Sequence, residues 1–187
     1  RAAVVAARRA SARWKSGGEV VRRRRLTGSD GLGTGVGKVG GQVIHAVLEA
    51  LDLSRPADER EAEALALLPV EADEAGLGPV EREACADLLR RILAHPVLER
   101  ARTAVEVWRE TPFAIRDRGR VVAGTIDLCF PTDASRERWV VVDWKSDAPP
   151  EGSALRASYE AQVAFYAKAL LATVAPCQHV ETFLVGP

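Results

Sequence analysis

The stretch Val140–Asp147, which reads Val-Val-Val-Asp-Trp-Lys-Ser-Asp, carries the strongest local signal in the chain. A run of branched apolar residues is typical of a strand that is buried on both faces, and this run ends abruptly in charged residues. Asp143 and Lys145 lie two positions apart, so their side chains point to the same side of an extended strand. The sequence therefore predicts a central strand with a carboxylate and an ammonium group at its end.

The simplest interpretation of Asp143 and Lys145 is an ion pair at the edge of a sheet. The preceding strand favours another, because Gly124–Leu128 reads Gly-Thr-Ile-Asp-Leu and surrounds Asp127 with apolar residues. Two buried carboxylates on adjacent strands are costly unless a cation lies between them, and Mg²⁺ prefers such oxygen ligands. The sequence thus predicts a magnesium site, with Lys145 placed to stabilise charge on a phosphoryl oxygen or to position the attacking water. In the alternative, one Asp pairs with Lys145 and the other is exposed.

Hydrophobic periodicity predicts the elements around these strands. Helical spacing begins at Gln42, with one buried face made of Val43, Ile44, Val47, Leu48 and Leu51. Further helices are predicted over residues 57–68, 79–94 and 155–173, the last with Ala161, Phe165, Ala169 and Leu170 on one side. Alternation predicts strands over residues 105–115, 121–130, 139–144 and 179–185. The order of helices, three strands, helix and strand predicts an α/β domain built from a meander and a crossover.

Composition excludes several classes of protein. The chain has 187 residues, 47% of them hydrophobic, which excludes wholesale disorder. No apolar run reaches the roughly 18 residues of a membrane span. The 26 basic and 26 acidic residues balance, so the net charge points to no polyanionic partner. Three distant cysteines form neither a disulfide framework nor a Cys-x-x-Cys knuckle, which favours a reducing, cytoplasmic setting. The chain begins with Arg and has no Met, so we expect a piece of a longer polypeptide.

Residues 1–40 read as a basic, glycine-rich connector from a preceding domain, and residues 41–187 as the folded domain. A run of like charges usually lies in solvent, so an exposed connector is the plainer interpretation. The alternative is a DNA-contacting arm, formed by Arg22, Arg23, Arg24 and Arg25. The spacing Gly35-x-Gly37-x-x-Gly40 matches a dinucleotide fingerprint, but an arginine-rich polar stretch precedes it instead of a strand. A nucleotide-dependent enzyme is therefore disfavoured.

Two pairs of polar residues show helical spacing. His45 and Glu49 lie one turn apart, as do Gln162 and Tyr166, so each pair shares a helix face. Each pair alone also suits an ordinary helix surface. Together with the strands they form an ordered set of motifs: Gly41-x-x-x-His45-x-x-x-Glu49, Glu110-Thr-Pro-Phe113, Gly124-x-Ile-Asp127-Leu128, Asp143-Trp-Lys145-Ser-Asp147 and Gln162-x-x-x-Tyr166.

This ordered set resembles the RecB-family nuclease domain of the PD-(D/E)XK superfamily, and most closely the C-terminal nuclease domain of AddA-type helicase–nucleases. The resemblance covers roughly Gly41 to Val185. It implies a restriction-endonuclease-like α/β core, an αβββαβ mixed sheet flanked by helices, here with extra N-terminal helices. It also implies a metal-dependent deoxyribonuclease of the exonuclease type, part of a helicase–nuclease that acts in double-strand break repair and recombination.

The resemblance also implies roles for individual residues. The implied metal ligands are His45, Asp127, Asp143 and the backbone carbonyl of Trp144, with Glu49 and Glu110 as further candidates. Lys145 corresponds to the catalytic lysine, and Gln162 and Tyr166 to a helix motif that supports the active site and the DNA strand. The implied cofactor is Mg²⁺, with Mn²⁺ as the alternative, and in such enzymes the metal activates water and offsets charge on the scissile phosphate.

Departures from the family pattern refine the expected partners. Gly40 stands where the family often has Arg, and Trp144 where it usually has Tyr. AddB-type relatives hold an iron–sulfur cluster with four cysteines, so three scattered cysteines favour the AddA type and no such cluster is expected. We expect DNA as substrate, a covalently attached helicase domain, an AddB-like partner subunit and a cytoplasmic, nucleoid-associated location. The rival hypothesis is a catalytically silent DNA-binding or scaffold module of the same fold.

Overall fold

The computed structural model describes residues 36–187, which form two compact units. The described part of the sheet unit comprises Val105–Val142 and Ala161–Phe183. The described part of the helical unit comprises residues 36–104 together with Asp143–Glu160 and Leu184–Pro187. The predictions for residues 1–35, including the four consecutive arginines and Gly35, lie outside the described residues.

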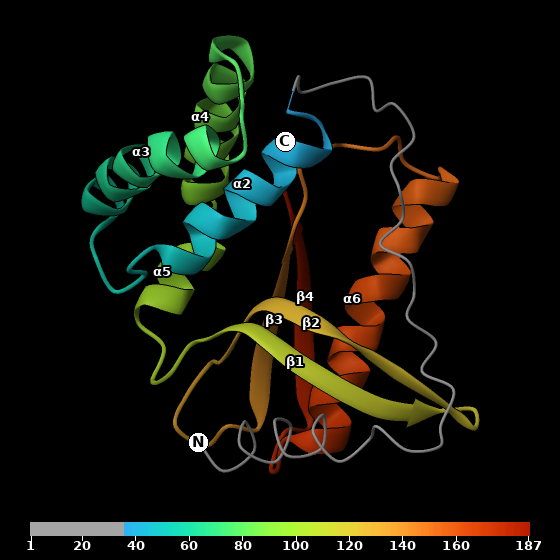
Figure 1. Ribbon diagram of the computed structural model, residues 1–187. Coiled ribbons are helices and arrows are strands. Elements are labelled where there is room, and N and C mark those ends of the chain that lie inside the picture. Colours follow the sequence, from blue (N-terminus) through green and yellow to red (C-terminus); the bar gives the residue numbers. More distant parts are fainter. Residues whose placement is uncertain (1–35) are drawn as a thin grey trace. The chain divides into compact units, whose positions relative to one another are not determined.

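A four-stranded mixed sheet with the order β1-β2-β3-β4 is the framework of the fold (Figure 1). Its strands are β1 (Trp108–Asp117), β2 (Arg120–Pro131), β3 (Arg138–Trp144) and β4 (His179–Val185). The first three form the predicted antiparallel meander. β4 runs parallel to β3, as two backbone hydrogen bonds show. At one end His179 N–H, at the start of β4, donates to the carbonyl of Glu137 just before β3 (3.0 Å), and at the other end Lys145 N–H, just after β3, donates to the carbonyl of Val185 at the end of β4 (2.9 Å). The predicted αβββαβ order, restriction-endonuclease-like, is confirmed.

The buried strand expected from the run of valines is β3. Every residue from Trp139 to Trp144 is buried, and β2 and β4 flank the strand on either side. The C-terminal half of β2, Ile126–Pro131, is buried as well. Two carboxylates lie within these apolar stretches: Asp127 is 9% exposed and Asp143 is 1% exposed. β1 starts at Trp108, later than predicted, and Val105, which precedes the strand, is 59% exposed.

Helix α6 (Ala154–Thr173) connects β3 to β4. Its buried residues are Val163, Tyr166, Ala169 and Leu170, whereas Ala161 is exposed and Phe165 is half-buried. The side that these residues mark in the sequence is therefore buried only at Ala169 and Leu170, and the buried face of the helix is rotated from it. Alanine and larger apolar residues surround most of this helix, so periodicity alone does not single out one face. The sheet decides instead, since the Phe113 ring of β1 packs edge-on against Tyr166 at 5.6 Å between centroids.

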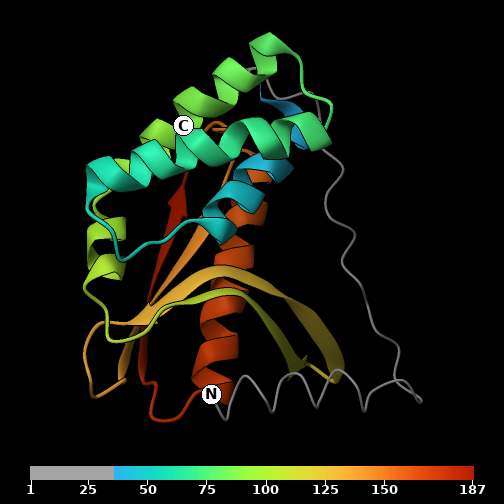
Figure 2. The ribbon, with the colours of Figure 1, turned by 60° about the vertical axis from the view of Figure 1, so that its left-hand side comes forward.

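Four helices form most of the helical unit: α2 (Gly37–Ala50), α3 (Ala57–Glu74), α4 (Pro79–Leu93) and α5 (Val97–Arg102). α3 and α4 lie side by side (Figure 2). All five apolar residues predicted for the first helix face are buried. None of the helices within residues 36–187 combines the length and apolar character needed to cross a membrane.

The start of α2 and the presence of α5 differ from the predictions. α2 begins at Gly37 rather than Gln42, so its first turn contains glycines, which local propensity disfavours in a helix. Close packing selects glycine at Gly40, where a Cβ would lie 2.8 Å from Val36 Cγ1 and 3.0 Å from Cys85 Sγ. A short helix such as α5 leaves little periodic signal. Its Glu99 forms an ion pair with Arg60 of α3, which is 1% exposed.

Candidate active site

The strands β1 and β2 place two carboxylates opposite each other. Arg109 pairs with Leu128 and Thr111 pairs with Ile126, so Glu110 and Asp127 occupy the intervening positions. Glu110 has a φ of 40°, in the left-handed region that side chains other than glycine rarely adopt. Such a conformation costs about 1–3 kcal/mol and persists only where the surrounding structure holds it. The backbone is therefore strained at one of the two acids.

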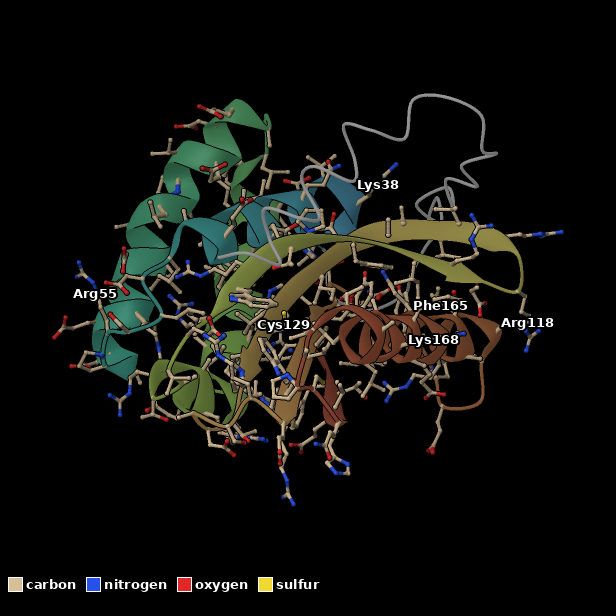
Figure 3. The ribbon with its side chains drawn as sticks, turned by 90° about the horizontal axis from the view of Figure 1, so that it is seen from below. Lys38, Arg55, Arg118, Cys129, Phe165 and Lys168 are labelled. Carbon is tan, nitrogen blue, oxygen red and sulfur yellow. The ribbon has the colours of Figure 1, made fainter. Side chains whose placement is uncertain are left out.

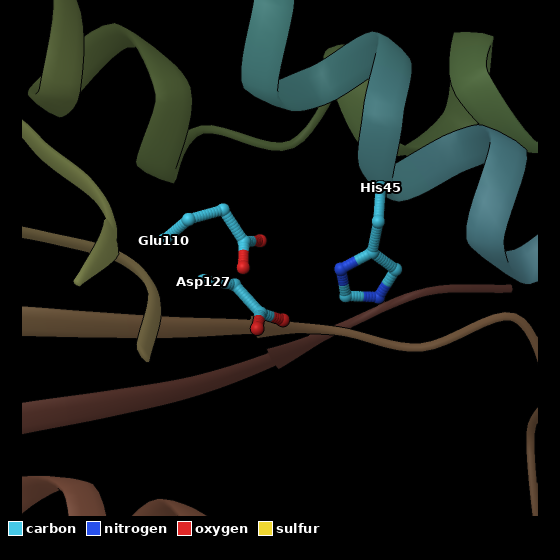
Figure 4. Close-up of side chains that lie close together, drawn as sticks. All are labelled: His45, Glu110 and Asp127. Atoms are coloured by element: carbon cyan, nitrogen blue, oxygen red, sulfur yellow. The ribbon is translucent and has the colours of Figure 1, made fainter. Parts of the chain in front are cut away.

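His45, Glu110 and Asp127 together form a group of metal-binding character. Each offers one ligand atom, and these atoms all lie within 4.8 Å of one another (Figure 4). His45 is a half-buried residue of α2. An imidazole nitrogen and two carboxylate oxygens are suitable ligands for a divalent cation such as Mg²⁺ or Mn²⁺. The donor chemistry of the three side chains thus fits the cation that the family resemblance implies.

Asp143 and Lys145, at the end of β3, form an ion pair. Asp143 Oδ2 lies 2.5 Å from Lys145 Nζ, and the two side chains are 2% and 14% exposed. Leu128 of β2 pairs with Val142 of β3, and the two acids are the next residues on the same side of this pair: Asp127 precedes Leu128 and Asp143 follows Val142. Among the described residues, however, the Asp143 carboxylate does not join the group of His45, Glu110 and Asp127. The simple ion pair considered from the sequence is thus present.

The Lys145 ammonium also lies over an aromatic ring that the sequence did not single out. Nζ is 4.3 Å from the centroid of the Tyr159 ring, on the first half of α6. The Tyr159 hydroxyl donates to Asp147, with distances of 2.9 and 3.0 Å to the two carboxylate oxygens. Burial, followed by the hydrogen bond to Asp147, raises the pKa of Tyr159. Tyr159 precedes Gln162 by three residues, and this helical spacing is the signal that could have identified it.

The remaining predicted residues have different surroundings. Gln162 Nε2 donates to the Tyr166 hydroxyl at 2.6 Å, and Tyr166 is 6% exposed. This hydrogen bond joins the predicted helix pair. Glu49 is exposed on α2, and Trp144 is 5% exposed. The predicted roles of Gln162 and Tyr166, of Glu49 and of the Trp144 carbonyl stay predictions.

Comparison with known protein families agrees with this arrangement. No curated protein sequence matches the chain. The family model of the PD-(D/E)XK nuclease superfamily matches residues 20–185, which span all the helices and strands described above. The chain therefore belongs to the PD-(D/E)XK nuclease superfamily.

Proposed function

We propose that this chain is a metal-dependent deoxyribonuclease domain that hydrolyses phosphodiester bonds. The observation that carries the proposal is the group of His45, Glu110 and Asp127, with ligand atoms within 4.8 Å of one another. Three groups of this kind leave coordination positions for water and for phosphate oxygens. Membership of a nuclease superfamily supplies the reaction class.

The three side chains would hold Mg²⁺, with Mn²⁺ as the alternative cation. A bound divalent cation would supply positive charge to the scissile phosphate and would lower the pKa of a water molecule. Glu110 and Asp127 contribute the negative charge that attracts the cation, and His45 contributes a neutral donor. Asp143 and the Trp144 carbonyl are proposed as additional ligands. Leu128 of β2 pairs with Val142 of β3, so Asp127, just before Leu128, and Asp143, just after Val142, lie at neighbouring positions of the two strands.

Lys145 is proposed to stabilise negative charge on the phosphate during hydrolysis. Its side chain is 14% exposed, so its ammonium is little screened by solvent and yet accessible to a substrate oxygen. Asp143 holds this ammonium at the end of β3. Gln162 and Tyr166, joined by their hydrogen bond, are proposed to support the site and contact the DNA strand.

The order of the five sequence motifs supports a more specific proposal. The domain would be the RecB-type nuclease of an AddA-like helicase–nuclease that processes double-strand breaks for recombination. It would act as an exonuclease on DNA delivered by a helicase domain of the same polypeptide, beside an AddB-like subunit. DNA binding would depend mainly on phosphate contacts and would weaken with salt, and Arg22–Arg25 are candidates for additional contacts.

Replacing Lys145 with alanine is expected to slow hydrolysis by about 10²–10³-fold, as removal of one charge-stabilising group does in other enzymes. The substrate would be end-labelled linear DNA, single- and double-stranded, incubated with Mg²⁺ or with EDTA. Cleavage by the wild-type chain should require Mg²⁺, and Asp143→Ala should also slow it. Circular dichroism of each variant would show whether it is folded. Equal rates for a folded Lys145→Ala variant and the wild type would exclude the proposed role of Lys145.

A further inference from the structure

The Tyr159 ring lies beside the ammonium group of Lys145, and Asp147 accepts a hydrogen bond from the Tyr159 hydroxyl. We propose that Tyr159 is a positioning residue for Lys145, and that Asp147 fixes the Tyr159 ring in the orientation this requires. The proposal rests on the proposed function, in that it assigns a catalytic purpose to the position of Lys145. It adds two residues to the site, one from the loop after β3 and one from α6.

The contact between Lys145 and Tyr159 has the geometry of a cation–π interaction. Nζ lies 4.3 Å from the ring centroid, within the distance of about 6 Å at which the ring quadrupole attracts a cation. The interaction is stronger where the charge is partly removed from water, and the Lys145 side chain is 14% exposed. The ring therefore provides an attraction that acts on the ammonium in addition to that of Asp143.

Asp147 holds the ring through the hydroxyl group. Both carboxylate oxygens of Asp147 are within hydrogen-bond distance of the Tyr159 hydroxyl, at 2.9 and 3.0 Å. A phenol is protonated at neutral pH, and burial, followed by this hydrogen bond, raises the pKa of Tyr159 further, so the hydroxyl keeps donating. Asp147 thereby links the loop that carries Lys145 to the helix that carries Tyr159.

Two different attractions explain why a long, flexible lysine can be held in one place. The Asp143 carboxylate binds the ammonium through charge and a short contact. The Tyr159 ring attracts it through its π face, without offering a second carboxylate as acceptor. A lysine held in this way loses side-chain freedom before substrate binds, which lowers the entropic cost of reaching a phosphate oxygen.

The contact can be measured directly by NMR of ¹³C-labelled lysine. The chain has only four lysines, so the ε-methylene signals can be assigned with a Lys145→Arg variant. The Tyr159 ring should shift the Lys145 ε-protons upfield through its ring current. Tyr159→Leu should remove this shift and Tyr159→Phe, which keeps a ring, should retain most of it. Lys168, whose Nζ lies 5.9 Å from the Phe165 ring, is an internal reference that should not change in either variant (Figure 3).

The same variants test the catalytic purpose of the contact. Tyr159→Leu should lower kcat for Mg²⁺-dependent DNA cleavage roughly tenfold, the rate equivalent of one partly buried cation–π contact, with little change in KM. Tyr159→Phe should retain more activity than Tyr159→Leu, and Asp147→Asn should lie between the wild type and Tyr159→Leu. This ordering separates positioning from a general loss of structure, because the phenylalanine variant preserves both the ring and the packing.

The outcomes distinguish this proposal from the proposed function. An unchanged Lys145 ε-signal in Tyr159→Leu would overturn the contact, whatever the activity. A lost shift with an unaltered kcat would overturn the positioning role while leaving the nuclease assignment intact. A folded wild-type chain that does not cleave DNA in Mg²⁺ would overturn the proposed function and, with it, the catalytic role of the contact.

Discussion

Asp127→Asn is expected to reduce Mg²⁺-dependent DNA hydrolysis to the rate that the wild-type chain shows in EDTA. Asparagine has nearly the same shape as aspartate but lacks its negative charge, so a change in packing is not expected. Asp127 is 9% exposed, lies opposite Glu110 in the register of β1 and β2, and belongs to the proposed ligand group. The measurement is the initial rate of cleavage of end-labelled linear DNA with and without Mg²⁺.

A matched control is available in the turn that follows the same strand. Asp133 is exposed and accepts a hydrogen bond from the Ser135 backbone N–H at 2.9 Å. Asp133→Asn makes the same chemical change outside the ligand group, and it should cleave DNA at the wild-type rate. Cleavage by a folded Asp127→Asn variant at the wild-type rate would show that the metal-ligand assignment of Asp127 is wrong.

Trp139→Ala is expected to lower the free energy of unfolding by about 3–5 kcal/mol, the range observed when a large buried aromatic side chain is truncated. Trp139 is 1% exposed, and the centroids of the Trp139 and Trp108 rings are 4.5 Å apart. Its indole N–H donates to the Arg136 carbonyl at 2.9 Å. The substitution would remove apolar burial and leave a cavity beside the Trp108 ring. Urea denaturation followed by circular dichroism would give the change.

Two comparisons make this stability prediction specific. Trp139→Phe keeps a ring in the same space and loses the indole N–H, so it should cost less than Trp139→Ala. Leu171→Ala removes an apolar side chain that is 48% exposed on α6, and it should change stability by no more than about 0.5 kcal/mol. Equal denaturation midpoints for Trp139→Ala and Leu171→Ala would contradict the central position of Trp139 in the core.

Several features of the fold follow from short-range patterns in the sequence. The valines before Asp143 predicted a buried central strand, and β3 is that strand. Alternation predicted the two strands that pair as the hairpin of β1 and β2. The burial of Asp127 and Asp143 was also predictable, because each interrupts an apolar run within a strand. These features depend on residues close together in sequence.

Features that depend on distant residues were missed. The left-handed conformation of Glu110 reflects its surroundings in the sheet, since glutamate has no local preference for it. The Tyr159 contact joins a loop and a helix, and Arg60 is buried because α5 supplies Glu99 as a partner. The buried face of α6 differs from the side expected from periodicity, because the sheet selects Tyr166 for burial. Tertiary packing decides each of these.

The central claim is that His45, Glu110 and Asp127 bind one divalent cation. The most direct test is calorimetric titration of the DNA-free chain with Mn²⁺ and with Mg²⁺, for the wild type and for His45→Ala, Glu110→Gln and Asp127→Asn. Glu137→Gln, an exposed carboxylate just before β3, is the control.

We predict one saturable site per chain. Loss of a residue that merely supports a metal ligand typically weakens metal binding by roughly 10–100-fold. Each of the three variants removes a ligand itself, so each should weaken binding by more than this. The Glu137→Gln control should bind the cation as the wild type does. The same affinity in the wild type and in all three folded variants, or no saturable binding by the wild type, would contradict the account.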